Sequence, residues 1–431
     1  MKKLVLLGGS VASLKAVELL HERGVVPEKI LMLPSTEYPL VDRSRYTEGV
    51  IRQLKPRQIS YRGEEFFDKY NIEVMADKTV TRVNVSRKKI HFDDRSQTDY
   101  DVLIIADTPS HKFGPVKGTQ KEGVFGFVSA RHMQQFGTLA ALNDGVAIQS
   151  DQWWALDLAL QLGQKNKEVI LSLSSRHPLI FQTEQAFQDC LVRMLHACNI
   201  SVLINNPVEE ILGDSDAKAI KVKSGKVYAA QVVLLEDVHP DLRIFSEGLE
   251  IDEDRFIVDN KFRTNIEDVY AVDHVAQRSR ETWQYYGPLT AFLEHQAEAL
   301  INGLLGSETS SEEPIARMAL GAGEFTVTAV GQIVERRAIS SQTQTDSEAG
   351  TFLRMFARDG VVAGLLAVNS TVNGDAIGAH IRESRRAESV WAEMVPESPR
   401  QDAGIETASP VTDGINQEAS FTTPVEPDSI P

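Results

Sequence analysis

The chain of 431 residues is 42% hydrophobic and 25% charged, which is typical of a globular protein with two or three domains. Its formal net charge of −16 disfavours a nucleic-acid partner, whose phosphates bind basic surfaces, and also opposes docking of small acidic redox carriers. Apolar runs are too short to cross a membrane, and glycines interrupt the run after Met-Lys-Lys too early for a signal peptide. We therefore expect no membrane partner and a cytoplasmic location.

The two cysteines predict neither a disulfide nor a metal site. Cys190 and Cys198 fall in one segment with helical periodicity, where eight residues span about 12 Å, too far for a disulfide. We expect two buried or half-buried thiols, since free cysteines are among the most buried residues.

The chain opens on a strand–helix–strand pattern. Lys3 to Leu7 is a short apolar strand, Gly8-Gly9-Ser10 follows it, and Ala12 to Arg23 has the periodicity of a helix that Gly24 ends. A second apolar strand is predicted at Lys29 to Leu33. Further strands of this first unit are predicted at Val80–Val85, Lys89–Phe92 and Leu103–Ile105.

The same pattern then restarts, which predicts a second unit inserted in the first. After it, Val232–Leu235 and Val269–Val272 are expected to return to the first sheet, and an amphipathic helix is predicted at Leu289–Leu305. The predicted elements of the second unit are strands at Val146–Ile148, Glu168–Leu173 and Ile200–Ile204 and helices at Trp153–Gln164 and Glu184–Ala197.

The remainder divides into a small region and a tail. The small region is predicted to have strands at Phe325–Val330, Gly350–Ala357 and Val361–Val368 and a helix at Gly374–Glu393. From Pro396 the chain has six prolines, seven acids and one arginine, and it buries too little apolar surface to become ordered. The sequence thus predicts an α/β fold of two Rossmann-like units, one inserted in the other, with a small α+β domain and a disordered acidic tail. The boundaries are 1–112 with 235–310 for the first unit, 113–234 for the second, 315–395 for the small domain and 396–431 for the tail.

Several segments, taken in order along the chain, resemble the motifs of one known protein family. They are Lys3–Ala16, Pro39–Arg43, Tyr100–Ala106, Lys167–Leu171, Val269–Val275, Tyr286–Gly306 and the region 325–370. Together they resemble the FAD/NAD(P)-dependent pyridine nucleotide oxidoreductases, in particular the ferredoxin-reductase, rubredoxin-reductase and nitrite-reductase flavin modules. The resemblance covers about residues 1 to 395 and implies FAD in the first unit, NAD(P)H in the second and a redox protein partner.

A dinucleotide fingerprint needs three small residues, for a tight turn, for close approach of the pyrophosphate and for packing of the helix on the strand. Gly8, followed by Gly9, fills the first role in the first unit, and Ser10 and Ser13 fill the second and third. The resemblance also places Arg43 near the flavin.

At the family's Gly-Asp position, which contacts the flavin side chain or its phosphate, this chain has Asp273-His274. Asp273 takes over the cofactor contact, or a protonated His274 favours the phosphate, or His274 has no cofactor role. These alternatives stay open on the sequence alone.

The second unit departs furthest from the fingerprint. Its three glycine positions are Ser150, Gln152 and Ala155, so the approach of a pyrophosphate is obstructed. Trp153 and Trp154 are expected in the core or at an interface.

No pair of cysteines follows the first fingerprint, which excludes a dithiol relay, and we assign no catalytic residue. The sequence favours an FAD-dependent oxidoreductase that moves electrons between NAD(P)H or a partner and an unidentified acceptor. The alternative is a pseudoenzyme of the same fold, acting as a binding or regulatory scaffold. Between them lies a flavoprotein that a partner protein, and not NAD(P)H, reduces.

Overall fold

A computed structural model describes most of the chain up to Val395. The described residues are 2–34, 45–106, 109–111, 113, 115–127, 129–174, 183–235, 238–240, 242–245, 248–252, 255–278, 289–307, 313–322, 325–333, 339–346 and 348–395. The predicted tail from Pro396 therefore lies outside the described residues. Within the described part, no helix is long and apolar enough to cross a membrane.

The first unit is built on a parallel sheet of five strands in the order β20-β7-β1-β2-β3. Nearly all strand side chains are buried, as continuous apolar runs predict for a sheet covered on both faces. The strands are β1 (Lys3–Leu7), β2 (Lys29–Leu33), β3 (Ile72–Val74), β7 (Val102–Ile105) and β20 (Val269–Ala271).

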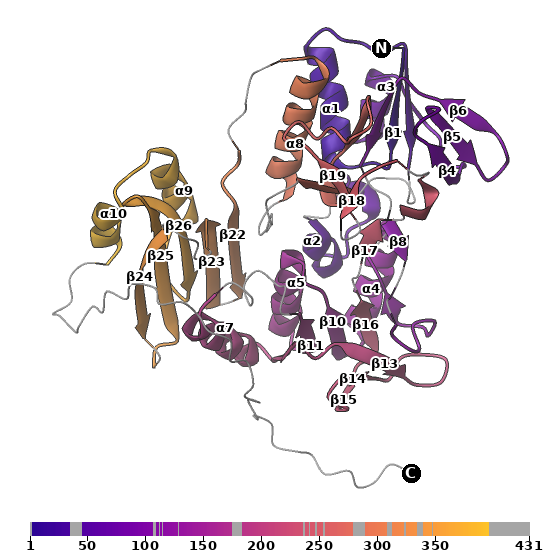
Figure 1. The fold of residues 1–431 in the computed structure, drawn as a ribbon. Coiled ribbons are helices and arrows are strands. Elements are labelled where there is room, and N and C mark those ends of the chain that lie inside the picture. The colour runs from indigo at the N-terminus through magenta and orange to yellow at the C-terminus, as the bar shows by residue number, and fades with distance from the viewer. Residues whose placement is uncertain are drawn as a thin grey trace. The chain divides into compact units, whose positions relative to one another are not determined.

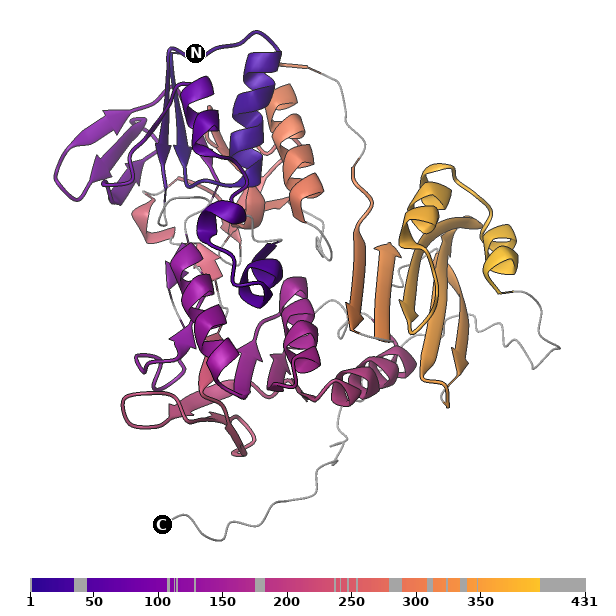
Figure 2. The ribbon, with the colours of Figure 1, turned by 180° about the vertical axis from the view of Figure 1, so that it is seen from behind.

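Two helices and a small antiparallel sheet cover the two faces. Helices α1 (Val11–Glu22) and α8 (Leu289–Leu304) pack side by side on one face, and the sheet of β4 (Val80–Asn84), β5 (Lys89–Phe92) and β6 (Gln97–Asp99) lies on the other (Figures 1 and 2). Gly24 ends α1 with a left-handed φ of +74°, as the sequence predicts. Short elements complete the unit: α2 (Tyr46–Ile51), α3 (Glu64–Lys69), β18 (Ile251–Asp252), β19 (Arg255–Val258) and β21 (Ala276–Arg278).

The second unit repeats the arrangement of the four strands β7-β1-β2-β3, whereas its remaining edge strand, β9, precedes the others along the chain. Its parallel sheet runs β12-β11-β10-β16-β9, with β10 at the centre as β1 is in the first sheet. The strands are β9 (Val124–Phe125), β10 (Gly145–Gln149), β11 (Glu168–Leu173), β12 (Ile200–Ile204) and β16 (Val232–Leu235). The helices are α4 (Ala130–Leu142), α5 (Trp153–Gln164) and α7 (Gln185–Ala197). A three-stranded sheet of β13 (Val208–Leu212), β14 (Ala219–Val222) and β15 (Val227–Ala229) adjoins them, and β8 (Pro109–His111) pairs with β17 (Val238–Pro240).

One predicted strand assignment is wrong. Val232–Leu235 does not return to the first sheet; as β16 it pairs with β10 and β9 in the second. Its apolar run suits any buried parallel strand, so composition could not choose between the two sheets. Val269–Val272 does return to the first sheet, through β20 beside β7. The second sheet is therefore inserted between strands of the first, which confirms the predicted fold class.

The C-terminal region is an antiparallel sheet in the order β22-β23-β26-β25-β24. Alternate residues of β25 face two cores: Phe352 packs against Phe187 of α7 with ring centroids 5.4 Å apart, whereas Leu353 and Met355 belong to the core beneath α9 and α10. The elements are β22 (Arg317–Ala322), β23 (Phe325–Gly331), β24 (Ile339–Asp346), β25 (Thr351–Arg358), β26 (Val361–Val368), α9 (Gly374–Arg382) and α10 (Ala387–Met394).

The single helix predicted at Gly374–Glu393 is wrong, because the chain breaks it into α9 and α10. Ser384 adopts a left-handed φ of +53°, and the carbonyl of Arg385 accepts a hydrogen bond from the amide of Val362 in the sheet. The break lets each short helix place its own apolar side on the sheet.

Candidate functional site

The loop after β1 keeps the tight glycine turn of a dinucleotide site. Gly8 has φ +80°, a conformation that side chains other than glycine rarely adopt, and its N–H donates to the carbonyl of Leu33 at the end of β2, 2.8 Å away. Gly8 itself is buried, while Gly9 and Ser10 are half-buried. The turn is thus fixed at the sheet edge where ligands of such folds bind, at the point where strand order reverses.

A pair of serines closes the start of α1. Ser10 is the N-cap, and its Oγ accepts from the N–H of Ser13 at 3.3 Å, while Ser13 Oγ accepts from the N–H of Ser10 at 3.0 Å. Ser13 is wholly buried, so it fits where the fingerprint requires a small residue between helix and strand. The N–H of Ser10, which a second glycine would offer to a phosphate, is instead engaged by Ser13.

The amino end of α1 still has anion-binding capacity. Helical geometry leaves the N–H groups of Val11 and Ala12 without intrahelical acceptors, and the first turn carries no acidic residue. The dipole of the helix adds partial positive charge there. This loop fits a dinucleotide phosphate, with two serines where the fingerprint has glycines.

Asp273 holds the backbone shape of the glycine that it replaces. Its φ is +65°, and its N–H donates to Oε1 of Gln296 on α8 at 2.7 Å. Its Oδ1 accepts from the N–H of His274 at 2.7 Å and lies 3.5 Å from Nδ1 of the same histidine. Since β20 and β1 are parallel and one strand apart, this turn and Gly8 lie at the same sheet edge, roughly 10 Å apart.

The sequence did not single out Gln296. A signal was present, because Gln296 interrupts the apolar stripe of α8 formed by Leu293, Ala297 and Leu300, and a buried amide there needs a hydrogen-bond partner. Arg43, which the resemblance places near the flavin, lies outside the described residues.

A half-buried charge network ties α1 to α8. Arg62 donates to both carboxylate oxygens of Glu18 at 2.9 Å, Lys15 lies 3.1 Å from Glu18, and the Tyr61 hydroxyl donates to Glu294 at 2.9 Å. Burial disfavours ionisation of Glu18, but hydrogen bonds from Arg62 and Lys15 prevail and lower its pKa. The network holds α8, which carries Gln296, beside α1, whose amino end forms the first site.

The loop after β10 differs completely. The carboxylate of Asp151 accepts a hydrogen bond from the N–H of Ser174 at 2.7 Å and another from its hydroxyl, and Ser174 directly follows β11. Gln152, the N-cap residue of α5, has an extended φ of −80° and no capping side-chain bond. An acidic side chain therefore bridges the carboxyl ends of two strands where a nucleotide would lie.

Trp154, at the start of α5, is buried as the sequence predicts. Its indole stacks on Phe127 with centroids 5.3 Å apart and meets Tyr46 edge-on at 5.7 Å. Its carbonyl accepts from the hydroxyl of Thr47 at 3.2 Å. Residues of α2 thus enter the core of the second unit. Trp153 is half-buried against the same cluster.

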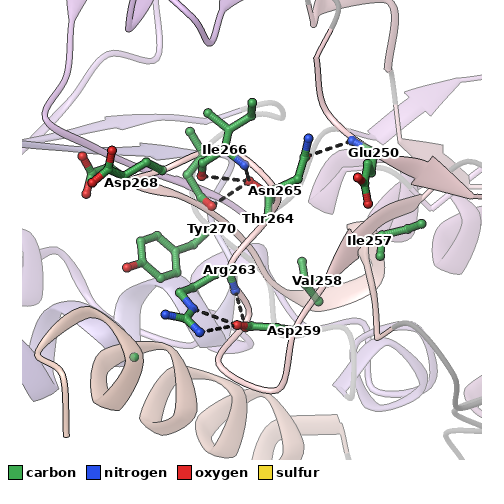
Figure 3. A pocket seen from close by; sticks show the side chains of 13 residues that line it. Glu250, Ile257, Val258, Asp259, Arg263, Thr264, Asn265, Ile266, Asp268 and Tyr270 are labelled. Atoms are coloured by element: carbon green, nitrogen blue, oxygen red, sulfur yellow. Dashed lines mark hydrogen bonds and ion pairs between the residues drawn. The ribbon is translucent and has the colours of Figure 1, made fainter.

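One hollow in the described surface lies elsewhere. A pocket of about 600 Å³ lies beside Asp268, which precedes β20, at the opposite end of that strand from Asp273 (Figure 3). Its polar groups are paired with one another: Arg263 binds Asp259 at 2.6 Å, and Asn265 accepts from the N–H of Glu250 at 3.0 Å. Its acidic lining and its position exclude it as the phosphate site.

The sequence profile of the pyridine nucleotide-disulphide oxidoreductase family matches residues 2–285, more than half of the chain. The chain belongs to this family. The assimilatory nitrate reductase electron transfer subunit of Bacillus subtilis is 24% identical over 375 residues, which cover 86% of this chain and 48% of that protein. The nitrite reductase [NAD(P)H] of the same organism is 21% identical and covers 96% of this chain and 51% of its own length. The chain spans about half the length of these two relatives.

Solved structures agree with the fold. An NAD-dependent persulfide reductase from A. fulgidus superposes with a TM-score of 0.73 at 19% identity, over 92% of this chain and 80% of that one. The covalent complex of putidaredoxin reductase with putidaredoxin gives a TM-score of 0.74 at 14% identity, over 89% and 93%. Both the family and the fold class predicted from the sequence are thus confirmed.

Proposed function

We propose that this member of the oxidoreductase family binds FAD at the loop after β1 and transfers electrons to or from a redox protein partner. The observation that carries the proposal is the left-handed Gly8 turn, tied to Leu33, in front of a helix whose first turn has no carboxylate. This combination of a tight turn and a free positive helix end is what a pyrophosphate requires.

Each residue of the first loop has a proposed role. Gly8 and Gly9 let the backbone approach the pyrophosphate, and the N–H groups of Val11 and Ala12 donate to it. Ser13 keeps α1 close to β1, and the hydroxyl of Ser10 can rotate from its cap toward an oxygen of the ligand. When bound, the flavin supplies the electron-transfer chemistry, while the chain binds and orients it.

The turn at Asp273 is proposed to face the flavin side chain from the same sheet edge. Its position is fixed by Gln296, so the backbone is preset before any ligand arrives. Asp273 or His274 contacts the cofactor there, and Arg43 is proposed to complete the site from the segment after β2.

The comparisons support an electron-transfer role without identifying the acceptor. One relative is named an electron transfer subunit, and one solved relative is bound to the redox protein putidaredoxin. The electron donor is NAD(P)H or a second protein.

The visible absorption spectrum of the purified full-length protein tests this proposal. We expect a stoichiometric flavin band, with FAD released on heating and identified by chromatography. If the protein is colourless and also takes up no added FAD in a binding titration, the proposal is wrong.

The same measurement tests the alternative predicted from the sequence, a scaffold without turnover. The bridge of Asp151 to Ser174 supports that alternative, because it places a carboxylate at one of the two dinucleotide loops. A protein without flavin that still binds a partner would support it.

A further inference from the structure

We propose that the second unit is closed to nicotinamide dinucleotides, because Asp151 holds the position of the nucleotide's anion with its own carboxylate. This inference concerns the second loop alone and does not require that the first loop binds flavin. It predicts that electrons reach the protein from a donor other than NAD(P)H bound at this sheet.

Two of the groups that a nucleotide would use are already engaged. In this topology a dinucleotide lies across the carboxyl ends of the central strand β10 and its neighbour β11. Here the N–H and the hydroxyl of Ser174, at the end of β11, both donate to Asp151. Both donors of Ser174 therefore already have an acceptor within the protein.

Two more side chains form hydrogen bonds at the carboxyl ends of β10 and β11. Gln149, the last residue of β10, accepts from the N–H of Val208 at 2.7 Å, and Ser172 of β11 donates to the carbonyl of Asn206 at 3.3 Å. These bonds join the ends of β10 and β11 to the segment between β12 and β13. A ligand would have to break several of them to enter.

The backbone offers no compensating turn. Where Gly8 adopts φ +80° in the first loop, the second loop has Ser150, which is 3% exposed, and Gln152 in an extended conformation. Ser150 Oγ accepts from the N–H of Gln152 at 3.1 Å, as Ser13 Oγ does from the N–H of Ser10 in the first loop. The second loop therefore differs in lacking the left-handed glycine turn that brings backbone N–H groups toward a pyrophosphate.

The charge has the wrong sign. A carboxylate beside the amino end of α5 offsets the partial positive charge of that helix and repels phosphate directly. At contact distances in a half-buried site, such a like-charge pair lowers affinity by roughly a hundredfold or more. Replacement of a glycine by an uncharged residue would weaken nucleotide binding, whereas a carboxylate at position 151 repels the nucleotide.

Direct binding of NADH and NADPH to the full-length protein is the first test. We expect no saturable heat in calorimetric titrations up to millimolar nucleotide, and unchanged hydrogen–deuterium exchange in the peptide that covers residues 145–160. Exchange reports on the second loop separately, so nucleotide bound at the first site cannot be mistaken for binding here. Micromolar binding with protection of that peptide overturns the proposal.

A pair of variants isolates the carboxylate. Ser150→Gly with Gln152→Gly opens the backbone but keeps Asp151, and the triple variant adds Asp151→Gly. We expect the triple variant to bind NADH at least tenfold more tightly than the double. Equal affinity of the two variants, or no binding by a folded triple variant, overturns the proposed role of Asp151.

Two controls keep this comparison sound. Asp189→Asn removes one acid from the exposed surface of α7 in the same unit and should change nothing. If loss of the bridge unfolds the triple variant, Asp151→Asn in the double background removes the charge yet keeps an oxygen that accepts from Ser174. That variant must then show the tenfold gain.

Discussion

The loops after β1 and β10 each follow the central strand of a five-stranded parallel sheet, yet their chemistry is opposite. The first keeps a left-handed glycine and a helix end free of acid. The second has lost the glycine turn and carries Asp151 across the strand ends. Equivalent topology therefore preserves the place for a ligand but not the ability to bind it.

The two loops also show that the residues that stabilise the fold differ from those that would bind a cofactor. Both sheets are maintained by buried apolar strands, such as Leu4 to Leu7 and Val146 to Ile148, whose side chains are nearly inaccessible. The loops contribute little to that burial, so they can lose their glycines while the sheets persist.

The largest effect on flavin binding is expected at the left-handed turn of Gly8, which only the first loop has. Gly8→Val forces a β-branched residue to φ +80° and fills the space beside the pyrophosphate, so we expect no flavin to survive purification. Gly24→Val is the matched control, since Gly24 has φ +74° with no atom within 4 Å of an added Cβ. Both variants place valine at a left-handed φ, which costs about 1–2 kcal/mol of backbone strain, but only the first should be colourless. Equal flavin loss in both would assign the effect to stability.

A second variant makes the first loop resemble the second. Ser10→Asp keeps a good N-cap but adds a carboxylate, and we expect flavin affinity to fall by about 1–3 kcal/mol, roughly fivefold to 150-fold. Ser129→Asp, at the N-cap of α4, is the control, because Ser129 caps the amide of His132 in the same way at 3.2 Å. An unchanged dissociation constant for Ser10→Asp would show that the phosphate does not lie at α1.

The helices behind the two loops differ in their buried charges. The seventh residue after Gly8 is Lys15, which pairs with Glu18, whereas the seventh after Ser150 is Asp157. Burial raises the pKa of Asp157, although hydrogen bonds with Thr47 and Gln161 oppose the shift.

The folded state binds the proton of the Asp157 carboxyl more tightly than the unfolded state does. The contribution of this proton to the free energy of unfolding is therefore complete below the ordinary pKa of about 4, and it is lost as pH rises through the raised pKa. We expect Asp157→Asn to have a higher Tm than the wild type at pH 7 and a similar one at pH 3.5, measured by calorimetry. Glu168→Gln, at the exposed start of β11, is the control for removal of a carboxylate elsewhere in the same unit. A constant difference across pH would contradict the assignment to Asp157.

The smallest effect is expected at Asp273, where an acid keeps the glycine conformation. Asp273→Gly removes left-handed strain but also the bond to the amide of His274, so the free energy of unfolding should change by about 1 kcal/mol or less. Flavin affinity should rise if the carboxylate is merely tolerated and fall if it contacts the cofactor. Chemical denaturation and a flavin titration of the same sample measure both quantities.

Most of the fold was predictable because its signals are local. Apolar runs and glycines located four of the five strands of each parallel sheet, and the boundaries of α5 and β11 agree with the predicted ones. Errors arose where tertiary pairing decides: Val232–Leu235 joined the second sheet, and the short edge strands β3 and β9 were missed, as were β22 and β24 of the C-terminal sheet.

The candidate site was predictable in its residues but not in its contacts. Gly8, Ser10 and Ser13 could be assigned from the fingerprint, whereas the mutual capping of the two serines depends on rotamers. The bridge of Asp151 to Ser174 joins residues that only the neighbouring strands bring together, so no spacing rule reveals it. The roles of Arg43 and His274 toward a cofactor stay predictions.

The aromatic packing around Trp154 explains why a unit closed to nucleotide would still be retained. Tyr46 and Val50 of α2 belong to the same continuous core as Phe127 and Trp154, and that core extends to Phe352 of the C-terminal sheet. A protein fragment of residues 113–234 would expose this shared interior to water. Deletion of the same residues would expose the core residues of α2 and of the C-terminal sheet that pack against them. The second unit is thus not an excisable module, because its interior is also the interior of its neighbours.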